Sequence, residues 1–298
     1  MPGAVVVPGS AQAWLLAIRP RTLPASAAPV ILGWALAATA GPVRWPLGAA
    51  CLVVALALQA AANLANDYFD AQSGVDRAER LGPVRVTQTG LLQPSQVLGG
   101  LVICLAIGAI AGLFAAWQAG WWLVGLGAVC LLGAVAYTAG PLPLAHLGLG
   151  EVAALVFFGP VACTGTFTAL HGAPTAAAWA AGLVPGCHAA ALMAVNNLRD
   201  LASDRAAGKR TLAVRAGERA ARLVPVVCLV LGNLLVAPLA RLAGRPLAFL
   251  ALALVPLSWP LLRSILREPL SPAFNTTLAG VGRWELLTAI VVSALLVL

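Results

Sequence analysis

The stretch CLVVALALQAAANLANDYFD, residues 51–70, passes from an uninterrupted apolar run into a group of amides and acids. Its first twelve residues hold no charged side chain, which is typical of a helix that crosses a membrane. Its last residues include Asn63, Asn66, Asp67 and Asp70. The apolar run predicts the fold class, and the polar end raises the question of what a membrane helix does with carboxylates there.

The composition of the whole chain agrees with a membrane protein. Hydrophobic residues make up 61% of the 298 residues, charged residues make up 9%, and the mean hydropathy is +0.92, whereas soluble domains carry about 25% charged residues. The apolar runs are continuous, which favours helices over a membrane β-barrel. We therefore expect an all-α integral membrane protein, one bundle and one domain over residues 1–298. Nine membrane-spanning segments are predicted, at 23–40, 46–66, 95–117, 120–137, 151–171, 174–196, 221–241, 246–266 and 281–298.

The basic residues predict how this bundle lies in the bilayer. If the N-terminus is cytoplasmic, every lysine and arginine except Arg44, Arg241 and Arg245 falls on the cytoplasmic side, as the positive-inside rule requires. This bias accounts for the net charge of +8, so the expected partner is the lipid bilayer and no nucleic acid is needed. All the acids fall on the same side, although the rule makes no demand on acids. We infer that carboxylates serve a function there.

Two predicted helix ends on that side carry similar sets of amides and acids. The first set is Asn63, Asn66, Asp67 and Asp70. The second set is Asn196, Asn197, Asp200 and Asp204. In each set the spacing predicts that the side chains share one helix face. The motifs NDYFD (66–70) and NNLRD (196–200) are offset by 130 residues and point the same way, which predicts a parallel pseudo-repeat that brings the two ends close together.

These oxygen-rich sets predict a site for a divalent cation. Oxygen ligands favour Mg²⁺ or Ca²⁺, and Mg²⁺ completes its shell with water and substrate phosphate. Basic residues near the acids would bind phosphate oxygens, and the candidates are Arg21, Arg85, Lys209 and Arg210. Acids and bases together predict a diphosphate site. Glu151 ends a Gly/Pro-rich loop and is either a helix-start residue or one that binds an acceptor or handles a proton.

Four segments of the chain resemble the UbiA superfamily of intramembrane prenyltransferases, and the resemblance covers nearly the whole chain. The segments are WLLAIRPRTLPA (14–25), NDYFDAQSGVDRAERLGPVRVTQTG (66–90), YTAGPLPLAHLGLGE (137–151) and NNLRDLASDRAAGKRTLAVRAG (196–217). That family has nine helices and two Asp-rich motifs. Where its general first motif has a further Asp, this chain has Gly74, with Asp76 two residues later. This departure resembles the naphthoate branch of the family.

The resemblance implies a Mg²⁺-dependent transferase in a bacterial inner membrane, with its site facing the cytoplasm. It implies a polyprenyl diphosphate donor and a 1,4-dihydroxy-2-naphthoate acceptor, which loses CO₂ and becomes a demethylmenaquinol. The expected metal-binding residues are Asn66, Asp67, Asp70, Asp76, Asn196, Asp200 and Asp204. The expected catalytic residues are Asp67, Asp70, Asp200, Asp204 and Glu151.

Two alternatives stay open at the level of the sequence. A prenyltransferase for another aromatic acceptor, such as 4-hydroxybenzoate or homogentisate, would use the same diphosphate site. A secondary transporter would also carry paired polar helix ends, but it predicts acids near the bilayer midplane and charge on both sides. The predicted segments place every acid on one side, which favours the enzyme.

Overall fold

The computed structural model describes residues 6–73, 85–138 and 147–298, apart from the side chains at 70, 72, 73 and 134–138. Every element in these ranges is a helix. The first half contains α1 (Ala11–Ile18), η1 (Pro20–Thr22), α2 (Leu23–Ala38), α3 (Trp45–Ser73), α4 (Pro94–Ala119), α5 (Trp122–Thr138), α6 (Gly150–Val156), η3 (Phe157–Val161) and α7 (Ala162–His171). The second half contains α8 (Ala176–Arg199), α9 (Leu201–Ala206), α10 (Leu212–Leu234), α11 (Val236–Leu242), η4 (Pro246–Ala253), α12 (Leu254–Leu257), α13 (Trp259–Arg267) and α14 (Phe274–Val297).

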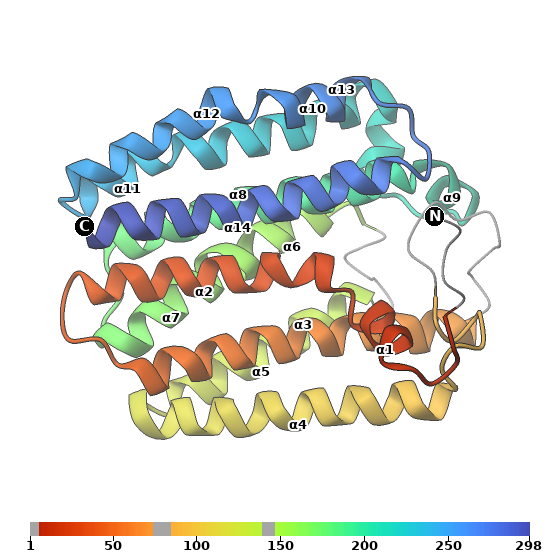
Figure 1. The fold of residues 1–298 in the computed structure, drawn as a ribbon, viewed down its shortest axis with the longest axis horizontal. Coiled ribbons are helices and arrows are strands. Elements are labelled where there is room, and N and C mark those ends of the chain that lie inside the picture. Colours follow the sequence, from red (N-terminus) through yellow and green to blue (C-terminus); the bar gives the residue numbers. More distant parts are fainter. Residues whose placement is uncertain (1–5, 74–84, 139–146) are drawn as a thin grey trace.

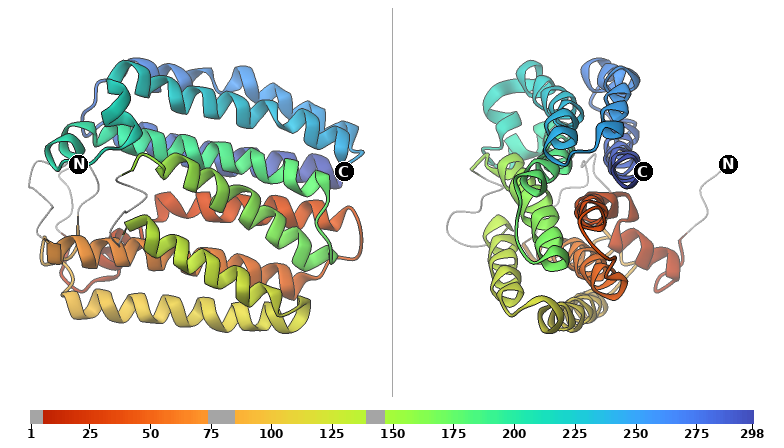
Figure 2. Two further views of the ribbon diagram at one scale, coloured as in Figure 1. Left: turned by 180° about the vertical axis from the view of Figure 1, so that it is seen from behind. Right: turned by 90° about the vertical axis from the view of Figure 1, so that its left-hand side faces the viewer.

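The long helices lie side by side along the long axis of the molecule (Figure 1), and the end-on view in Figure 2 looks nearly along them. Seven helical stretches in the described residues are long and apolar enough to cross a membrane. With so many stretches of this kind, the chain is a multi-pass membrane protein. The all-helical prediction is therefore confirmed.

The predicted count of nine full spans is not confirmed. Each predicted segment overlaps a helix, but α2 has only 16 residues and α5 has 17. Both fall short of the roughly 20 residues that cross a bilayer core. Gly41 and Pro42 follow α2 closely, and Pro does not continue a helix, so the apolar run there is longer than the helix it forms.

Helix α14 begins at Phe274, seven residues before the predicted segment. This earlier start changes the position of Glu285, which was expected near the cytoplasmic helix end. It lies eleven residues into the helix, about 16 Å along its axis at 1.5 Å per residue, and its side chain is completely buried. This acid therefore lies near the middle of α14 and not at a helix end.

Small residues let a bent pair of helices pack closely on α8. Helices α6 and α7 are joined by η3, where Gly159 has a non-helical backbone and is followed by Pro160. A side chain at Gly159 would meet the backbones of Gly182 and Gly186 on α8. Glycines four residues apart are a common device for close helix contact in membranes. This packing holds η3 against the middle of α8, while Glu151, at the start of α6, lies beside Asn197 near the carboxyl end of α8.

The two acidic helix ends lie at the same end of the bundle (Figure 1). The carboxyl end of α3 lies there beside α1, and the carboxyl end of α8 leads directly into α9. A small apolar cluster holds α1, α3, α4 and the turn 85–92 together, and its members are Ala13, Ala17, Leu64, Val86, Leu92 and Val97. The fold therefore places both predicted polar sets in one region.

Candidate active site

Asp67, at the end of α3, has both carboxylate oxygens occupied by a neighbouring turn. Its Oδ2 accepts a hydrogen bond from the backbone N–H of Val86 at 3.2 Å, and its Oδ1 accepts from the N–H of Thr87 at 3.2 Å. The Thr87 hydroxyl also contacts Oδ1 and the Asp67 carbonyl oxygen. The exposed fraction of Asp67 is 0%. This acid therefore points into the protein and holds the turn.

Asn63, one helical turn earlier, holds a second segment in a similar way. Its Nδ2 donates to the carbonyl oxygen of Ile18 at 2.8 Å and to the hydroxyl of Thr22 at 2.9 Å. Between these contacts lies Arg19, the one non-glycine residue in the described ranges with a positive φ, at 55°. Arg21 lies in the same short segment and is exposed. The Asn63 amide thus fixes a turn that carries a predicted phosphate-binding arginine.

The first predicted set therefore divides into two stripes. Asn63 and Asp67 are buried, whereas Asn66 is partly exposed. The predicted set lies on α3, with Asn63 and Asp67 turned inward and Asn66 more accessible. The side chain of Asp70 and the whole of Asp76 lie outside the described residues.

Arg85 begins the turn that Asp67 holds. The Arg85 carbonyl accepts hydrogen bonds from the N–H and hydroxyl of Thr89. The next side chain, Val86, is fully buried in the apolar cluster beside Leu92. Arg85 itself is buried, although it was predicted from a stretch that reads as a surface loop. The buried side chain of Val86 and the hydrogen bonds to Asp67 thus fix the backbone next to Arg85.

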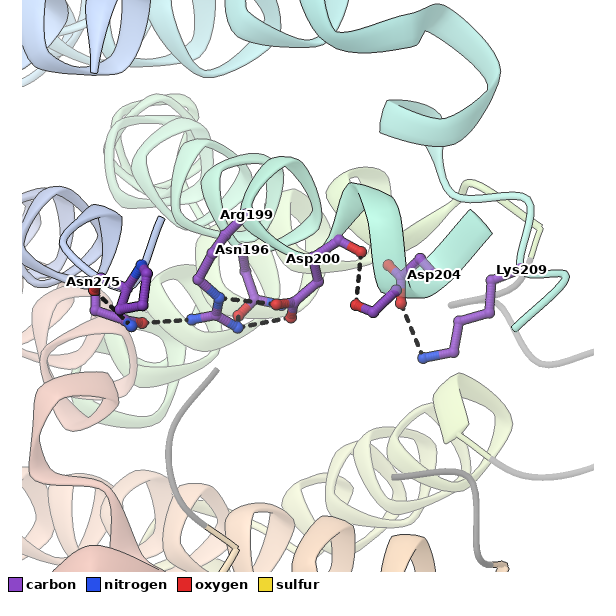
Figure 3. A network of polar contacts seen from close by, with 8 residues as sticks. Asn196, Arg199, Asp200, Asp204, Lys209 and Asn275 are labelled. Carbon is purple, nitrogen blue, oxygen red and sulfur yellow. Dashed lines mark hydrogen bonds and ion pairs between the residues drawn. The ribbon is translucent and has the colours of Figure 1, made fainter. Parts of the chain in front are cut away.

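The second helix end is organised around Arg199 (Figure 3). Its Nε donates to Oδ1 of Asp200 at 2.9 Å and its Nη2 donates to Oδ2 at 2.6 Å. Nη2 also donates to Asn196 Oδ1 at 2.9 Å, and Nη1 donates to Asn275 Oδ1, on α14, at 3.0 Å. The exposed fraction of Arg199 is 2%. This bidentate pair supplies the charge that a buried carboxylate needs.

Asp204 and Lys209 form a further ion pair at this end, at 3.2 Å. Lys209 is the more exposed partner, with 33% of its side chain accessible against 11% for Asp204. The Lys209 N–H also donates to the Asp204 carbonyl oxygen, so the loop after α9 turns back on the acid. Arg210 is exposed. The predicted acid and base therefore lie together, with the base able to leave toward solvent.

Glu151 lies at the start of α6, in contact with α8. Its Oε1 accepts a hydrogen bond from Asn197 Nδ2 at 2.9 Å. Its Oε2 is buried and has no hydrogen-bond partner among the described residues. The position in the first turn of α6 fits the helix-start alternative, while the open oxygen leaves a proton-accepting role available.

The donor set of the second end fits a hard divalent cation. The side-chain oxygens of Asn196, Asp200 and Asp204 suit Mg²⁺, and a bound ion would take the place of Arg199 and Lys209, which contact these oxygens in the structure. No group of three or more His, Cys, Asp or Glu side chains with metal-site geometry occurs in the described ranges. Amide oxygens, water and substrate phosphate would therefore have to supply part of the shell.

Three residues of this site were missed or given no role by the sequence, and a fourth, Asn197, was expected in the oxygen-rich set but not as a partner of Glu151. Arg199 lies within the NNLRD motif, so its position was a usable signal. Asn275 follows a proline-containing loop, and nothing in the sequence links it to α8. Thr87 and Asn197 belong to the predicted stretches, but their partners become visible only in the fold.

Comparison with known proteins adds an independent finding. Residues 26–273 match the model of the UbiA prenyltransferase family. The chain is 40% identical over 211 residues to 1,4-dihydroxy-2-naphthoate octaprenyltransferase of Mycobacterium tuberculosis, covering 71% of this chain and 72% of the relative. It is 35% identical over 289 residues to the protein of the same name in Mycobacterium leprae, covering 96% of each.

The fold also matches a solved structure. A UbiA homologue from Archaeoglobus fulgidus, bound to GPP and Mg²⁺, superposes with a TM-score of 0.65 over 96% of this chain and 100% of that one. The sequence identity is 17%, so this likeness concerns the arrangement of the helices.

Proposed function

Because the chain belongs to the UbiA prenyltransferase family, we propose that it transfers a polyprenyl group from polyprenyl diphosphate to 1,4-dihydroxy-2-naphthoate. The observation that carries this proposal is the similarity, over nearly the full length, to relatives named for that acceptor. The structure supports it with two acidic helix ends and accompanying bases at one end of the bundle. A diphosphate site needs this combination of charges.

The proposed residues for the donor's diphosphate are Arg21, Arg85, Lys209 and Arg210. Arg85 is held by the turn at Asp67, and Lys209 is paired with Asp204. Their positive charges would stabilise the negative charge that grows on the leaving diphosphate. The prenyl tail would lie among the apolar helices, which exclude water from the reacting carbon.

The cation proposed for this site is Mg²⁺, which would neutralise part of the diphosphate charge when bound. Its proposed ligands are Asn66, Asp70, Asp76, Asn196, Asp200 and Asp204. The oxygen-only chemistry of the described members supports this choice. Asp67, which was also expected among the ligands, has both oxygens occupied by the 86–87 turn.

In the reaction, the bond between the allylic carbon and the diphosphate oxygen breaks, and its electron pair leaves with the diphosphate. The electron-rich acceptor ring forms a new carbon–carbon bond to the allylic carbon. The acceptor's carboxylate leaves as CO₂, returning the electron pair of that bond to the ring and giving a demethylmenaquinol. Glu151 is proposed to accept a phenol proton as the ring attacks and to return it to the ring oxygen once CO₂ has left, supported by its open buried Oε2.

The proposal places the protein in a bacterial inner membrane as a single domain over residues 1–298. Its N-terminus and its site face the cytoplasm, in agreement with the distribution of basic residues. The two halves are proposed to form a parallel pseudo-repeat of nine membrane segments, with α2 and α5 as the short ones.

The test is mass spectrometry of the products formed by the purified protein. It is given polyprenyl diphosphate, Mg²⁺ and a panel of 1,4-dihydroxy-2-naphthoate, 4-hydroxybenzoate and homogentisate. We expect a prenylated, decarboxylated naphthol and loss of the product with EDTA. Preference for another acceptor would overturn the acceptor assignment. Failure to consume the diphosphate in detergent, where no gradient exists, would overturn the enzyme and favour a transporter.

A further inference from the structure

We propose that Asp67 is a positioning residue that holds the turn carrying Arg85, and that it does not bind the metal ion. This inference rests on the proposed function, because Arg85 is proposed there to bind the donor's diphosphate. It assigns the two stripes of α3 to different tasks. Asn63 and Asp67 hold basic turns in place, and Asn66, on the neighbouring stripe, is partly exposed and remains a proposed ligand.

The hydrogen bonds of Asp67 leave little room for a cation. An ionised carboxylate offers about four acceptor positions, and the 86–87 turn supplies three donors to them, two amides and a hydroxyl. To bind a metal, the side chain would have to turn away and leave two backbone N–H groups without partners. Each orphaned buried group would carry the full desolvation penalty of an unpaired donor. A fully buried carboxylate with this set of donors is more stable where it is.

The hydrogen bonds between the 86–87 turn and Asp67 also restrict the backbone at Arg85. Val86 is anchored on both sides, because its N–H binds Asp67 and its carbonyl accepts from the N–H of Leu92 at 3.1 Å. Its side chain is buried in the apolar cluster. Arg85 precedes this anchored residue directly, and its own carbonyl is bound by Thr89. The side chain of Arg85 is therefore attached to a backbone whose position Asp67 helps to fix.

Asn63, one turn earlier on the same stripe, also holds a basic segment in place. Its amide binds the backbone before Arg19 and the hydroxyl after it. Arg19 has a left-handed backbone, which is unfavourable for a residue with a Cβ atom, so the flanking contacts stabilise a strained turn. Arg21 follows in that turn. Two basic segments are thus held by two adjacent side chains of α3.

The residue 130 positions after Asp67 behaves in a similar way. Asn197 is buried and donates to Glu151, at the start of α6. Its neighbour Asn196 binds Arg199 within the site. At both helix ends, therefore, the second residue of the motif holds a neighbouring segment.

The test combines kinetics with hydrogen exchange on the full-length protein. The variants are Asp67→Asn, Arg85→Gln and the double variant. The amide introduced by Asp67→Asn would keep one acceptor oxygen and present an N–H₂ to a backbone donor, so the turn loosens. We expect Asp67→Asn to raise the KM for prenyl diphosphate about tenfold, the effect of one lost charge-assisted hydrogen bond. The double variant should be no worse than Arg85→Gln alone.

Hydrogen exchange measures the turn itself, independently of catalysis. Asp67→Asn should speed exchange in peptides covering 85–92, and Asn66→Ala should leave them unchanged. If exchange rises but no prenyl transfer is found for the wild type, the positioning role stands and the proposed function fails. If exchange is unchanged and the Mg²⁺ concentration for half-maximal activity rises about tenfold, Asp67 is a metal ligand and the proposal is overturned.

A second variant keeps the test decisive if Asp67→Asn does not fold. Thr87→Val retains the carboxylate and both amide bonds and removes only the hydroxyl. We expect it to raise the KM for prenyl diphosphate about threefold, with an unchanged Mg²⁺ requirement, since one of the three hydrogen bonds to the Asp67 carboxylate is lost while both amide bonds remain. A shift in the Mg²⁺ requirement with an unchanged KM would contradict the proposal.

Discussion

The two acidic helix ends of this protein stabilise their carboxylates by different means. At the end of α3, Asp67 receives uncharged donors from the turn at 86–87. At the end of α8, Asp200 and Asp204 are paired with the side chains of Arg199 and Lys209. Backbone donors move only if the turn opens, whereas side chains exchange partners by changing rotamer. We infer that the first acid is a fixed support and that the second pair can exchange its partners for ligands.

The largest effect is expected from Asp200→Asn. The change removes a proposed metal ligand and the bidentate partner of a buried arginine. Because a bound cation contributes several kcal/mol of charge stabilisation, turnover should fall about 100-fold or more. Product formation is measured by mass spectrometry. Glu218→Gln is the matched control, since Glu218 also pairs with an arginine but is exposed. If Asp200→Asn retained near wild-type turnover, the carboxyl end of α8 would not be part of the active site.

Arg199→Lys should have the next largest effect, on stability. Lysine keeps the charge but lacks the planar fork that contacts Asp200, Asn196 and Asn275. The free energy of unfolding should fall by about 2 kcal/mol, as hydrogen bonds to charged groups are lost. Thermal unfolding in detergent measures this change. Arg219→Lys, at an exposed position, should leave the midpoint unchanged. Equal midpoints for the two variants would show that the fork is not needed.

Asn197→Leu tests the support of Glu151. The variant removes the Asn197–Glu151 hydrogen bond and leaves the buried Oε1 of Glu151 without a donor. Such an unsatisfied buried oxygen costs about 1–3 kcal/mol. We expect turnover to fall about tenfold with no change in the Mg²⁺ concentration for half-maximal activity. Asn197→Gln, which keeps the amide, should recover part of the rate. A changed Mg²⁺ requirement would place Asn197 among the ligands.

Lys209→Gln should have the smallest effect on stability. The Lys209–Asp204 pair is partly exposed, and exposed pairs contribute at most about 1 kcal/mol. The KM for prenyl diphosphate should still rise about threefold at low salt and less at high salt, because screening weakens such contacts. Kinetics at two salt concentrations measure both. A loss of stability as large as that of Arg199→Lys would contradict the distinction between the two ion pairs.

The helix periodicity of the first set could be predicted from the sequence, but its division could not. Spacing shows that Asn63 and Asp67 share a stripe. It does not show that this stripe turns inward, because the segments it contacts lie at 18–22 and 86–87, far along the chain. Residue type therefore suggested that this stripe binds a metal, and only the tertiary contacts reveal that Asn63 and Asp67 hold neighbouring segments in place.

The start of α14 was missed for a local reason. Residues 274–280 include Thr276 and Thr277, which lower the hydropathy of the segment. Their hydroxyls are satisfied within the protein, by Ala273 and by Glu268 and Ser264, so they fit a helix that hydropathy alone would begin later. The long apolar runs of α3, α4 and α8 were predicted well, because burial in lipid demands an unbroken apolar length.

The comparison between the two helix ends is tested most directly by calorimetric titration of Mg²⁺ into the purified protein with inorganic diphosphate present. Asp67→Asn and Asp200→Asn are compared with the wild type. We predict that Asp200→Asn weakens Mg²⁺ binding about tenfold or more, whereas Asp67→Asn leaves the Mg²⁺ affinity unchanged. An equal loss of affinity in both variants would show that the two acids bind the metal together and would contradict this account.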